Sequence, residues 1–157
     1  MGGLPGVWLA GSGAALDSVA SMGQSANIQF YNEIKGEHMS WWLGQLDIYC
    51  HASDAETFSM ALLQAMATGL PVISSSLPGV DEIFGSDRCC GVTVENTEDA
   101  WRQAISAMSS SSVSARSMGR AARQRVETHF TNEIMLRKYI MLVEGLVSAK
   151  RRGDPAR

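Results

Sequence analysis

The sequence predicts an α/β fold in which a parallel β-sheet is flanked by helices. Short apolar runs alternate with helix-like segments along the chain, which is the order that a parallel sheet covered on both faces requires. Glycine or proline lies beside several of these runs and marks turns. The length of 157 residues suits one domain with its own core. We assign this domain to residues 1–149 and a polar tail to residues 150–157.

The strands are expected where apolar or alternating residues form short runs between turn residues. The first run is apolar and is closed by Gly11-Ser12-Gly13, whereas the second alternates and carries Phe30 and Tyr31. Three further runs are rich in isoleucine, valine and tyrosine. The expected strands are residues 7–10, 27–31, 47–50, 71–74 and 91–94.

The helices are expected where apolar residues recur at helical spacing. In the segment 57–68 they include Phe58, Leu62 and Met66, and Gly69 and Pro71 follow as stop signals. A later helix is capped by Asn96 or Thr97. The expected helices are residues 14–23, 36–45, 57–68, 80–84, 98–109, 114–128 and 132–149.

Composition excludes several classes of protein. Hydrophobic residues make up 45% and charged residues 18%, as in an ordinary globular protein. We find no apolar run of the roughly 20 residues that cross a bilayer and no secretory signal. Three cysteines give no even disulfide framework. We therefore expect a cytoplasmic protein with reduced cysteines.

Charge is distributed unevenly along the chain. Residues 1–101 carry a formal charge of −10, and residues 102–157 carry +7. The basic C-terminal helices are either a solvated face or a surface that meets an acidic partner domain or the inner face of the plasma membrane. We assign no nucleic-acid partner. A homo-oligomer and an N-terminal acceptor domain are the protein partners that we consider.

The segment 47–84 carries the most specific pattern. Its strand is followed by Ser53, by Glu56-Thr57-Phe58-Ser59, by a helix with Gln64 and by Gly69-Leu70-Pro71-Val72. It resembles the donor-binding segment of family 4 glycosyltransferases, whose usual pattern is Pro-Ser, Glu-Gly-Phe-Gly, Leu-Glu-Ala-Met-Ala and Gly-x-Pro-Val. The likeness extends in order over nearly the whole chain. It implies a Rossmann-like domain, the C-terminal half of a GT-B fold.

Glu56 is the candidate catalytic residue. It follows a strand and precedes a helix, in the region where parallel α/β sheets bind ligands. A carboxylate there can accept hydrogen bonds from sugar hydroxyls. The helix start at Thr57-Phe58-Ser59 offers free backbone amides to a diphosphate. The alternative is that Glu56 is only an acid favoured by the helix dipole.

The resemblance implies the remaining donor contacts. Gln64 occupies the position where the family has a second Glu that binds ribose, and the loss of charge lowers donor affinity by about 1 kcal/mol. Gly11 and Gly13 let the donor approach the backbone, and Tyr31 lies where the family holds the base. We expect no metal and no cofactor, because the cysteines and histidines lack zinc-site spacing. The donor is a UDP-, GDP- or ADP-sugar.

The resemblance also implies a function and a deficit. The function is retaining transfer of a hexosyl group to a glycan or a lipid-linked acceptor, as in polysaccharide biosynthesis. The family's Arg and Lys diphosphate clamp, its acceptor domain and its first strand have no counterpart in the sequence, so the strand order has a gap. We therefore expect the chain to be inactive alone, and its status as an enzyme stays open. The alternative function is a catalytically silent nucleotide-sugar-binding or protein-interaction module.

Overall fold

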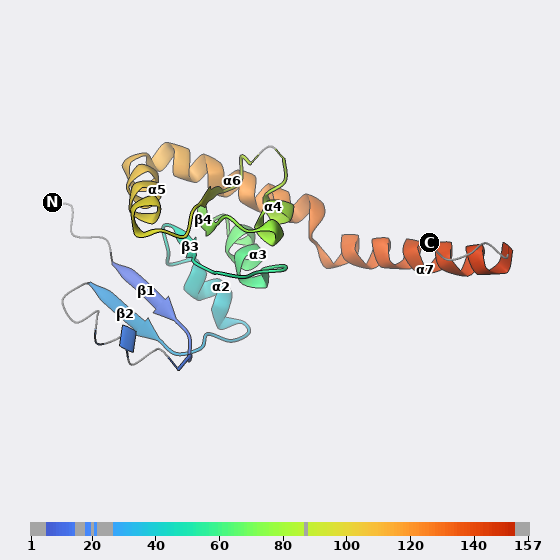
Figure 1. Ribbon diagram of the computed structural model, residues 1–157, viewed down its shortest axis with the longest axis horizontal. Helices are drawn as coiled ribbons and strands as arrows, with labels where there is room; N and C mark the ends of the chain where they lie inside the picture. Colours follow the sequence, from blue (N-terminus) through green and yellow to red (C-terminus); the bar gives the residue numbers. More distant parts are fainter. Residues whose placement is uncertain (1–5, 15–17, 20, 22–26, 87, 153–157) are drawn as a thin grey trace. The chain divides into compact units, whose positions relative to one another are not determined.

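The computed structural model describes residues 6–14, 18, 19, 21, 27–86 and 88–152. The chain divides into two compact units, Met1–Gln45 and Leu46–Arg157. Figure 1 shows the strands and helices of each unit.

A parallel pair of strands forms the centre of the first unit. β1 (Val7–Ala10) pairs with β2 (Ile28–Tyr31) in the register that sets Ala10 opposite Tyr31. The short helix α2 (His38–Leu43) follows. These elements confirm the two strands and the helix predicted for this region. The helix predicted at residues 14–23 lies largely outside the described residues.

Aromatic packing joins α2 to the two strands. The ring of Tyr31 lies 5.1 Å from that of Trp8 and 5.9 Å from that of Trp42, measured between centroids. Trp42 is buried, with 7% of its surface exposed. Its neighbour Trp41 is 66% exposed, because consecutive helical residues point about 100° apart.

The second unit contains a three-stranded parallel sheet. Its order is β3 (Tyr49–His51), β4 (Val72–Ser75) and β5 (Val92–Val94). All four residues of the central strand β4 are buried. The described strands therefore form two parallel sheets, β1-β2 and β3-β4-β5. No described strand joins these two sheets, and the break falls where the predicted order has its gap.

The helix that follows β3 begins later than predicted. α3 spans Met60–Ala67, whereas we expected residues 57–68. Its N-cap is Ser59, whose hydroxyl accepts a hydrogen bond from the backbone N–H of Leu62 at 3.2 Å. A serine side chain in this role fixes the helix start one residue after it. Gly69, with φ of +82°, ends the segment as predicted.

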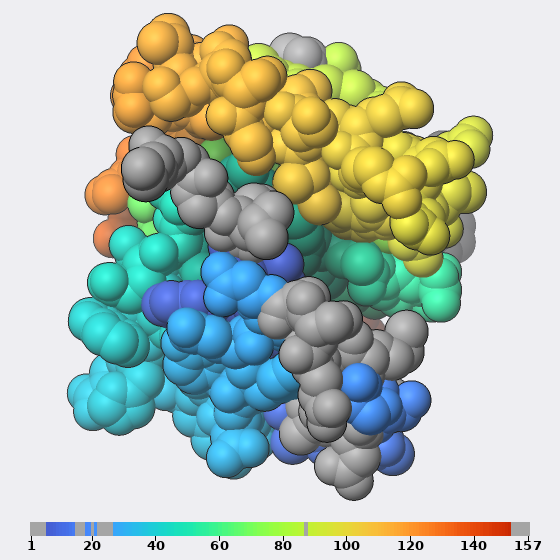
Figure 2. Space-filling model, turned by 90° about the vertical axis from the view of Figure 1, so that its left-hand side faces the viewer, coloured from blue at the N-terminus to red at the C-terminus, as the bar shows by residue number. Residues whose placement is uncertain are grey.

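Four more helices complete the second unit. α4 (Pro78–Phe84) follows β4, and α5 (Glu98–Ser110) follows β5. Thr97, not Asn96, caps α5, because its hydroxyl accepts from the N–H of Ala100. α6 (Ser112–His129) begins after the single residue Ser111, and the surfaces of α5 and α6 lie side by side (Figure 2, yellow and orange).

The helix α7 (Asn132–Arg152) is longer than the predicted helix 132–149 and takes in the start of the predicted tail. Residues 153–157 lie outside the described residues. In Figure 1, α7 extends away from the other elements of the second unit. None of the described helices is both long enough and apolar enough to span a bilayer.

The core of the second unit lies between the sheet and its helices. Its fully buried members come from α3, β4 and α4 and include Leu62, Met66, Val72, Ile73 and Phe84. Helix α6 approaches the turn after α3 so closely that a Cβ built on Gly119 would lie 2.0 Å from the Gly69 carbonyl oxygen. Such burial fixes the carboxyl ends of the three strands, where the candidate site lies.

Candidate functional site

Three loops meet at the carboxyl end of the β3-β4-β5 sheet. The backbone N–H of Ser53 donates to the Ser75 hydroxyl at 3.0 Å, which ties the loop after β3 to the end of β4. The backbone N–H of Ser76 donates to the carbonyl of Val94 at 2.8 Å, which ties β4 to β5. Parallel strands bring their carboxyl ends to one edge of a sheet. The hydrogen bonds therefore set these loops around a common region.

The loop after β5 closes the same region. The amide of Asn96 donates to the carboxylate of Asp54 at 2.6 Å. The indole N–H of Trp101, on α5, donates to the side-chain carbonyl of Asn96 at 2.9 Å. Asn96 therefore links the loop after β3 to α5, although it is not the helix cap.

Glu56 lies inside this frame and faces His51 at the end of β3. Glu56 Oε2 is 3.3 Å from His51 Nε2, and the side chains are 24% and 14% exposed. The His51 Nε2 atom is buried and has no hydrogen-bond partner among the described residues. The two atoms are thus within ion-pair distance but poorly aligned for a hydrogen bond. The Glu56 side chain is therefore partly exposed to solvent.

The neighbours of His51 add aromatic and electrostatic contacts. The rings of Tyr49 and His51 stack, with centroids 6.3 Å apart. Burial, and then the negative charges of Cys50 and Glu56, raise the pKa of Tyr49 above its ordinary value. The Glu56 carboxylate therefore acts electrostatically on Tyr49, whose ring stacks on His51.

Gly79, in the first turn of α4, supports Glu56 from the other side. A Cβ built on Gly79 would lie 2.4 Å from the carbonyl oxygen of Thr57 and 2.8 Å from that of Glu56. Only glycine allows so close an approach between two backbones. Packing against the preceding loop therefore explains why glycine stands at position 79.

The helix start that we expected at Thr57-Phe58-Ser59 lies later in the structure, whereas the diphosphate contacts predicted there stay a prediction. These three residues precede α3 and do not form its first turn, because Ser59 is the N-cap. The amide of Leu62 is already bonded to the Ser59 hydroxyl. The amides of Met60 and Ala61 are the first of the helix, and they have no partner within it. Phe58 packs on Phe130 with centroids 5.8 Å apart.

Gln64 lies on the exposed side of α3, in the turn after its first residues. Its position on the same helix as the Met60 and Ala61 amides agrees with a role in one extended site. The side chain is free to rotate, since it is exposed.

The other predicted contacts lie in the first unit. The N–H of Gly11 donates to the carbonyl of Tyr31 at 3.1 Å, so these two residues meet at the carboxyl end of β1-β2. A Cβ on Gly11 or on Gly13 would meet no atom within 4 Å. Packing against other described residues therefore does not explain why glycine stands at positions 11 and 13.

The basic side chains of the region have partners elsewhere. Lys35 lies 3.1 Å from Glu33, and Arg88 lies 2.9 Å from Asp81. Arg125 donates to the carbonyl of Ile83 at 3.0 Å, at the end of α4. No group of three or more His, Cys, Asp or Glu side chains in the described part of the chain is placed to hold a metal ion.

Two contributors to the site were missed from sequence. His51 was considered only for a zinc site or a triad, and its contact with Glu56 crosses a loop without any periodic signal. Ser75 carried a signal, because a serine run interrupts an otherwise apolar strand. Its hydroxyl, like that of Ser74, donates to the carbonyl of His51, at 3.5 and 3.4 Å respectively.

Comparison with known proteins gives a consistent result. The model of the family described as "Glycosyl transferases group 1" matches residues 9–125. The amylovoran biosynthesis glycosyltransferase AmsK of Erwinia amylovora is 29% identical over 116 residues, which is 70% of this chain and 28% of AmsK. The N-acetyl-alpha-D-glucosaminyl L-malate synthase of Bacillus anthracis is 29% identical over 106 residues, 67% of this chain and 28% of that protein. The chain thus spans under a third of the length of these relatives.

Solved structures show the same fold. Sucrose-phosphate synthase from Thermosynechococcus elongatus has a TM-score of 0.80 and 22% identity, over 90% of this chain and 38% of the synthase. Anabaena HepE, solved in complex with UDP and glucose, has a TM-score of 0.74 and 18% identity, over 91% of this chain and 40% of HepE. The predicted Rossmann-like half of a GT-B fold is confirmed by these likenesses.

Proposed function

We propose that this chain, which belongs to the glycosyl transferases group 1 family, forms the nucleotide-sugar-binding part of a retaining glycosyltransferase. The observation that carries the proposal is the position of Glu56. Its carboxylate is partly exposed beside the carboxyl end of β3 and close to the first residues of α3. Ligands of parallel α/β sheets bind at that end.

In this proposal Glu56 accepts hydrogen bonds from hydroxyls of the donor sugar. Charged acceptors bind hydroxyl groups more strongly than neutral acceptors do. The amides of Met60 and Ala61 bind the diphosphate with the help of the helix dipole. The side chain of Gln64 bonds the ribose diol, since a primary amide both donates and accepts.

In the first unit, Gly11, Gly13 and Tyr31 are the donor contacts of this proposal. The open space around the two glycines supports close approach of a phosphate or sugar to the backbone. The backbone at Tyr31 lies next to Gly11, which suits contact with the nucleotide base.

The relatives suggest which donor to test first. HepE was solved with UDP and glucose, and the pneumococcal O-GlcNAc transferase GtfA was solved with UDP and GlcNAc. AmsK is named for amylovoran biosynthesis. These names support a UDP-sugar as donor and a glycan or lipid-linked acceptor. The partners of Lys35 and Arg88 leave the diphosphate without a described clamp, which supports inactivity of the chain alone.

Isothermal calorimetry of the chain with UDP, GDP, ADP and UDP-glucose tests the proposal. We expect one nucleotide to bind with a Kd of roughly 1 µM to 1 mM. A folded sample, verified by circular dichroism, that binds none of the four would contradict it.

Two observations favour the alternative, a catalytically silent binding or interaction module. The Ser59 hydroxyl accepts the hydrogen bond of the Leu62 amide, which is then not available to a ligand. Gln64 stands at the position where the family has a carboxylate. Both changes weaken the donor site. Glycosyl transfer measured with and without a candidate acceptor-domain partner separates the two functions, because a silent module transfers no sugar in either case.

A further inference from the structure

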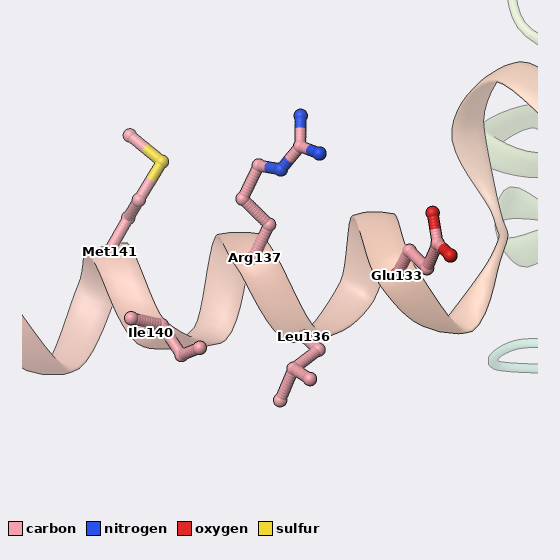
Figure 3. A pocket seen from close by; sticks show the side chains of 5 residues that line it. All are labelled: Glu133, Leu136, Arg137, Ile140 and Met141. Atoms are coloured by element: carbon pink, nitrogen blue, oxygen red, sulfur yellow. The ribbon is translucent and has the colours of Figure 1, made fainter.

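A shallow hollow of the described surface lies along α7 and not at the candidate site (Figure 3). All of the residues that line it belong to this one helix. They are Glu133, Leu136, Arg137, Ile140 and Met141. The proposed sugar contact does not use this hollow, so the position of the Glu56 carboxylate depends on the loop that carries it.

The loop that carries Glu56 is tied down near both of its ends. Near its start, the backbone N–H of Ser53 donates to the Ser75 hydroxyl at 3.0 Å. At its end, the Glu56 carbonyl lies so close to Gly79 that a Cβ built there would be 2.8 Å from it. Between these two points, the side chain of Asp54 connects the loop to the segment after β5.

Asn96 is the residue that holds Asp54. Its amide donates to the Asp54 carboxylate at 2.6 Å, and its side-chain carbonyl accepts from the indole N–H of Trp101 at 2.9 Å. An indole N–H can only donate, so it selects the carbonyl side of the amide and leaves the NH₂ group for the carboxylate. Because Trp101 lies on α5, the helix sets the orientation in which Asn96 meets the loop.

Asp54 and Glu56 thus have separate partners, although only one residue lies between them. Asp54 bonds Asn96, whereas Glu56 lies 3.3 Å from His51 on β3. Without the bond to Asn96, the loop would be held only near its ends and would sample more conformations. A sugar that needs one of those conformations then binds more weakly, because binding must also order the loop.

We propose that Asn96 is a positioning residue for the donor sugar. It holds the loop 52–56 in the conformation in which the Glu56 carboxylate receives the sugar hydroxyls, and it touches neither sugar nor nucleotide itself. The inference rests on the proposed function of Glu56. Its effect is confined to the sugar, because the amides proposed for the diphosphate belong to α3, whose start is fixed separately by the Ser59 cap.

Reversing the character of the Asn96 group tests the proposal. Asn96→Asp keeps an acceptor for Trp101 but sets a carboxylate against Asp54, so that an attractive contact becomes repulsive. Calorimetry should show UDP-glucose bound about five- to tenfold more weakly, with UDP binding within about twofold of the original. The double variant Asn96→Asp/Asp54→Asn re-forms the bond with exchanged roles and should bind UDP-glucose within about twofold of the original.

Two further variants serve as controls. Gln103→Glu adds the same negative charge at an exposed position of α5 and should leave both affinities unchanged. Asp54→Asn alone should lower the affinity for UDP-glucose less than about threefold, because two amides still form a hydrogen bond. Hydrogen exchange gives a readout without ligand: the Ser53 amide should exchange faster in Asn96→Asp and return to the original rate in the double variant.

The outcomes separate this inference from the proposed function. If the original chain, with its fold verified by circular dichroism, binds neither UDP nor UDP-glucose, the proposed function fails and the positioning role fails with it. If the original chain binds UDP-glucose, three results would overturn the positioning role alone. They are an unchanged affinity in Asn96→Asp, an equal weakening of UDP and UDP-glucose, and a defect that the double variant does not correct.

Discussion

His51 Nε2 lies 3.3 Å from Glu56 Oε2, across the loop that connects β3 to α3. The His51 ring is held by stacking on Tyr49, and its carbonyl accepts hydrogen bonds from two buried serines. The Glu56 carboxylate therefore lies beside a side chain that the sheet itself fixes.

We predict that His51→Phe weakens binding of UDP-glucose about three- to tenfold and leaves binding of UDP unchanged. Phenylalanine keeps the ring that stacks on Tyr49 but lacks the nitrogen that faces Glu56, and an ion-pair contact between partly exposed groups is worth up to about 1 kcal/mol. Calorimetry with both ligands measures the difference. His51→Gln, which retains a donor, should recover part of the loss. Equal weakening of both ligands would show that His51 has only a structural role.

Gly79→Ala should destabilise the second unit by about 1–3 kcal/mol, because the added Cβ collides with the backbone of Glu56 and Thr57. Urea unfolding followed by circular dichroism measures the change. Gly145→Ala is the matched control, since a Cβ there meets no atom within 4 Å. If both variants unfold at the same urea concentration as the original, the close approach at Gly79 is not required.

Gln64→Glu should strengthen UDP binding about fivefold, because a carboxylate adds a charge-assisted hydrogen bond to the ribose diol. The side chain is exposed, so the fold should tolerate the change. Calorimetric titration with UDP gives the affinity. An unchanged or lower affinity would mean that Gln64 does not contact the ribose.

Desolvation by neighbouring atoms raises the pKa of the Cys50 thiol from 9.0 to about 11, although the residue as a whole is exposed. The thiol should therefore react with iodoacetamide at pH 9 roughly 10- to 100-fold more slowly in the folded chain than in urea. Because the folded pKa is the higher one, stability falls as pH rises from 9 to 11. Peptide mass spectrometry follows Cys50 apart from the other cysteines. Equal rates in both states would refute the shift.

The sequence predicted the positions of the strands and helices better than the contacts between their residues. Apolar and alternating runs located all five predicted strands to within two residues, although β4 is the only one of the described strands that is buried at every position. The predicted start of α3, residue 57, was too early. Phe58 continues the apolar spacing, but Ser59 is the N-cap, so the helix begins at Met60. The sequence did not predict the division of the described strands into two sheets.

The candidate site was predicted in part. Glu56 was found from its place after a strand, and the structure sets it at the carboxyl end of β3. Its contact with His51 and the tie from Ser53 to Ser75 depend on loop geometry, which leaves no periodic trace in the sequence.

The central claim is that the Glu56 carboxylate holds the sugar of a nucleotide-sugar donor. The most direct measurement compares Glu56→Gln with the original chain for binding of UDP-glucose and of UDP. We predict that the substitution lowers the affinity for UDP-glucose about 10- to 100-fold, because it replaces charged hydrogen bonds with neutral ones, and that it changes UDP binding less than about twofold. An unchanged ratio between the two affinities would contradict the account.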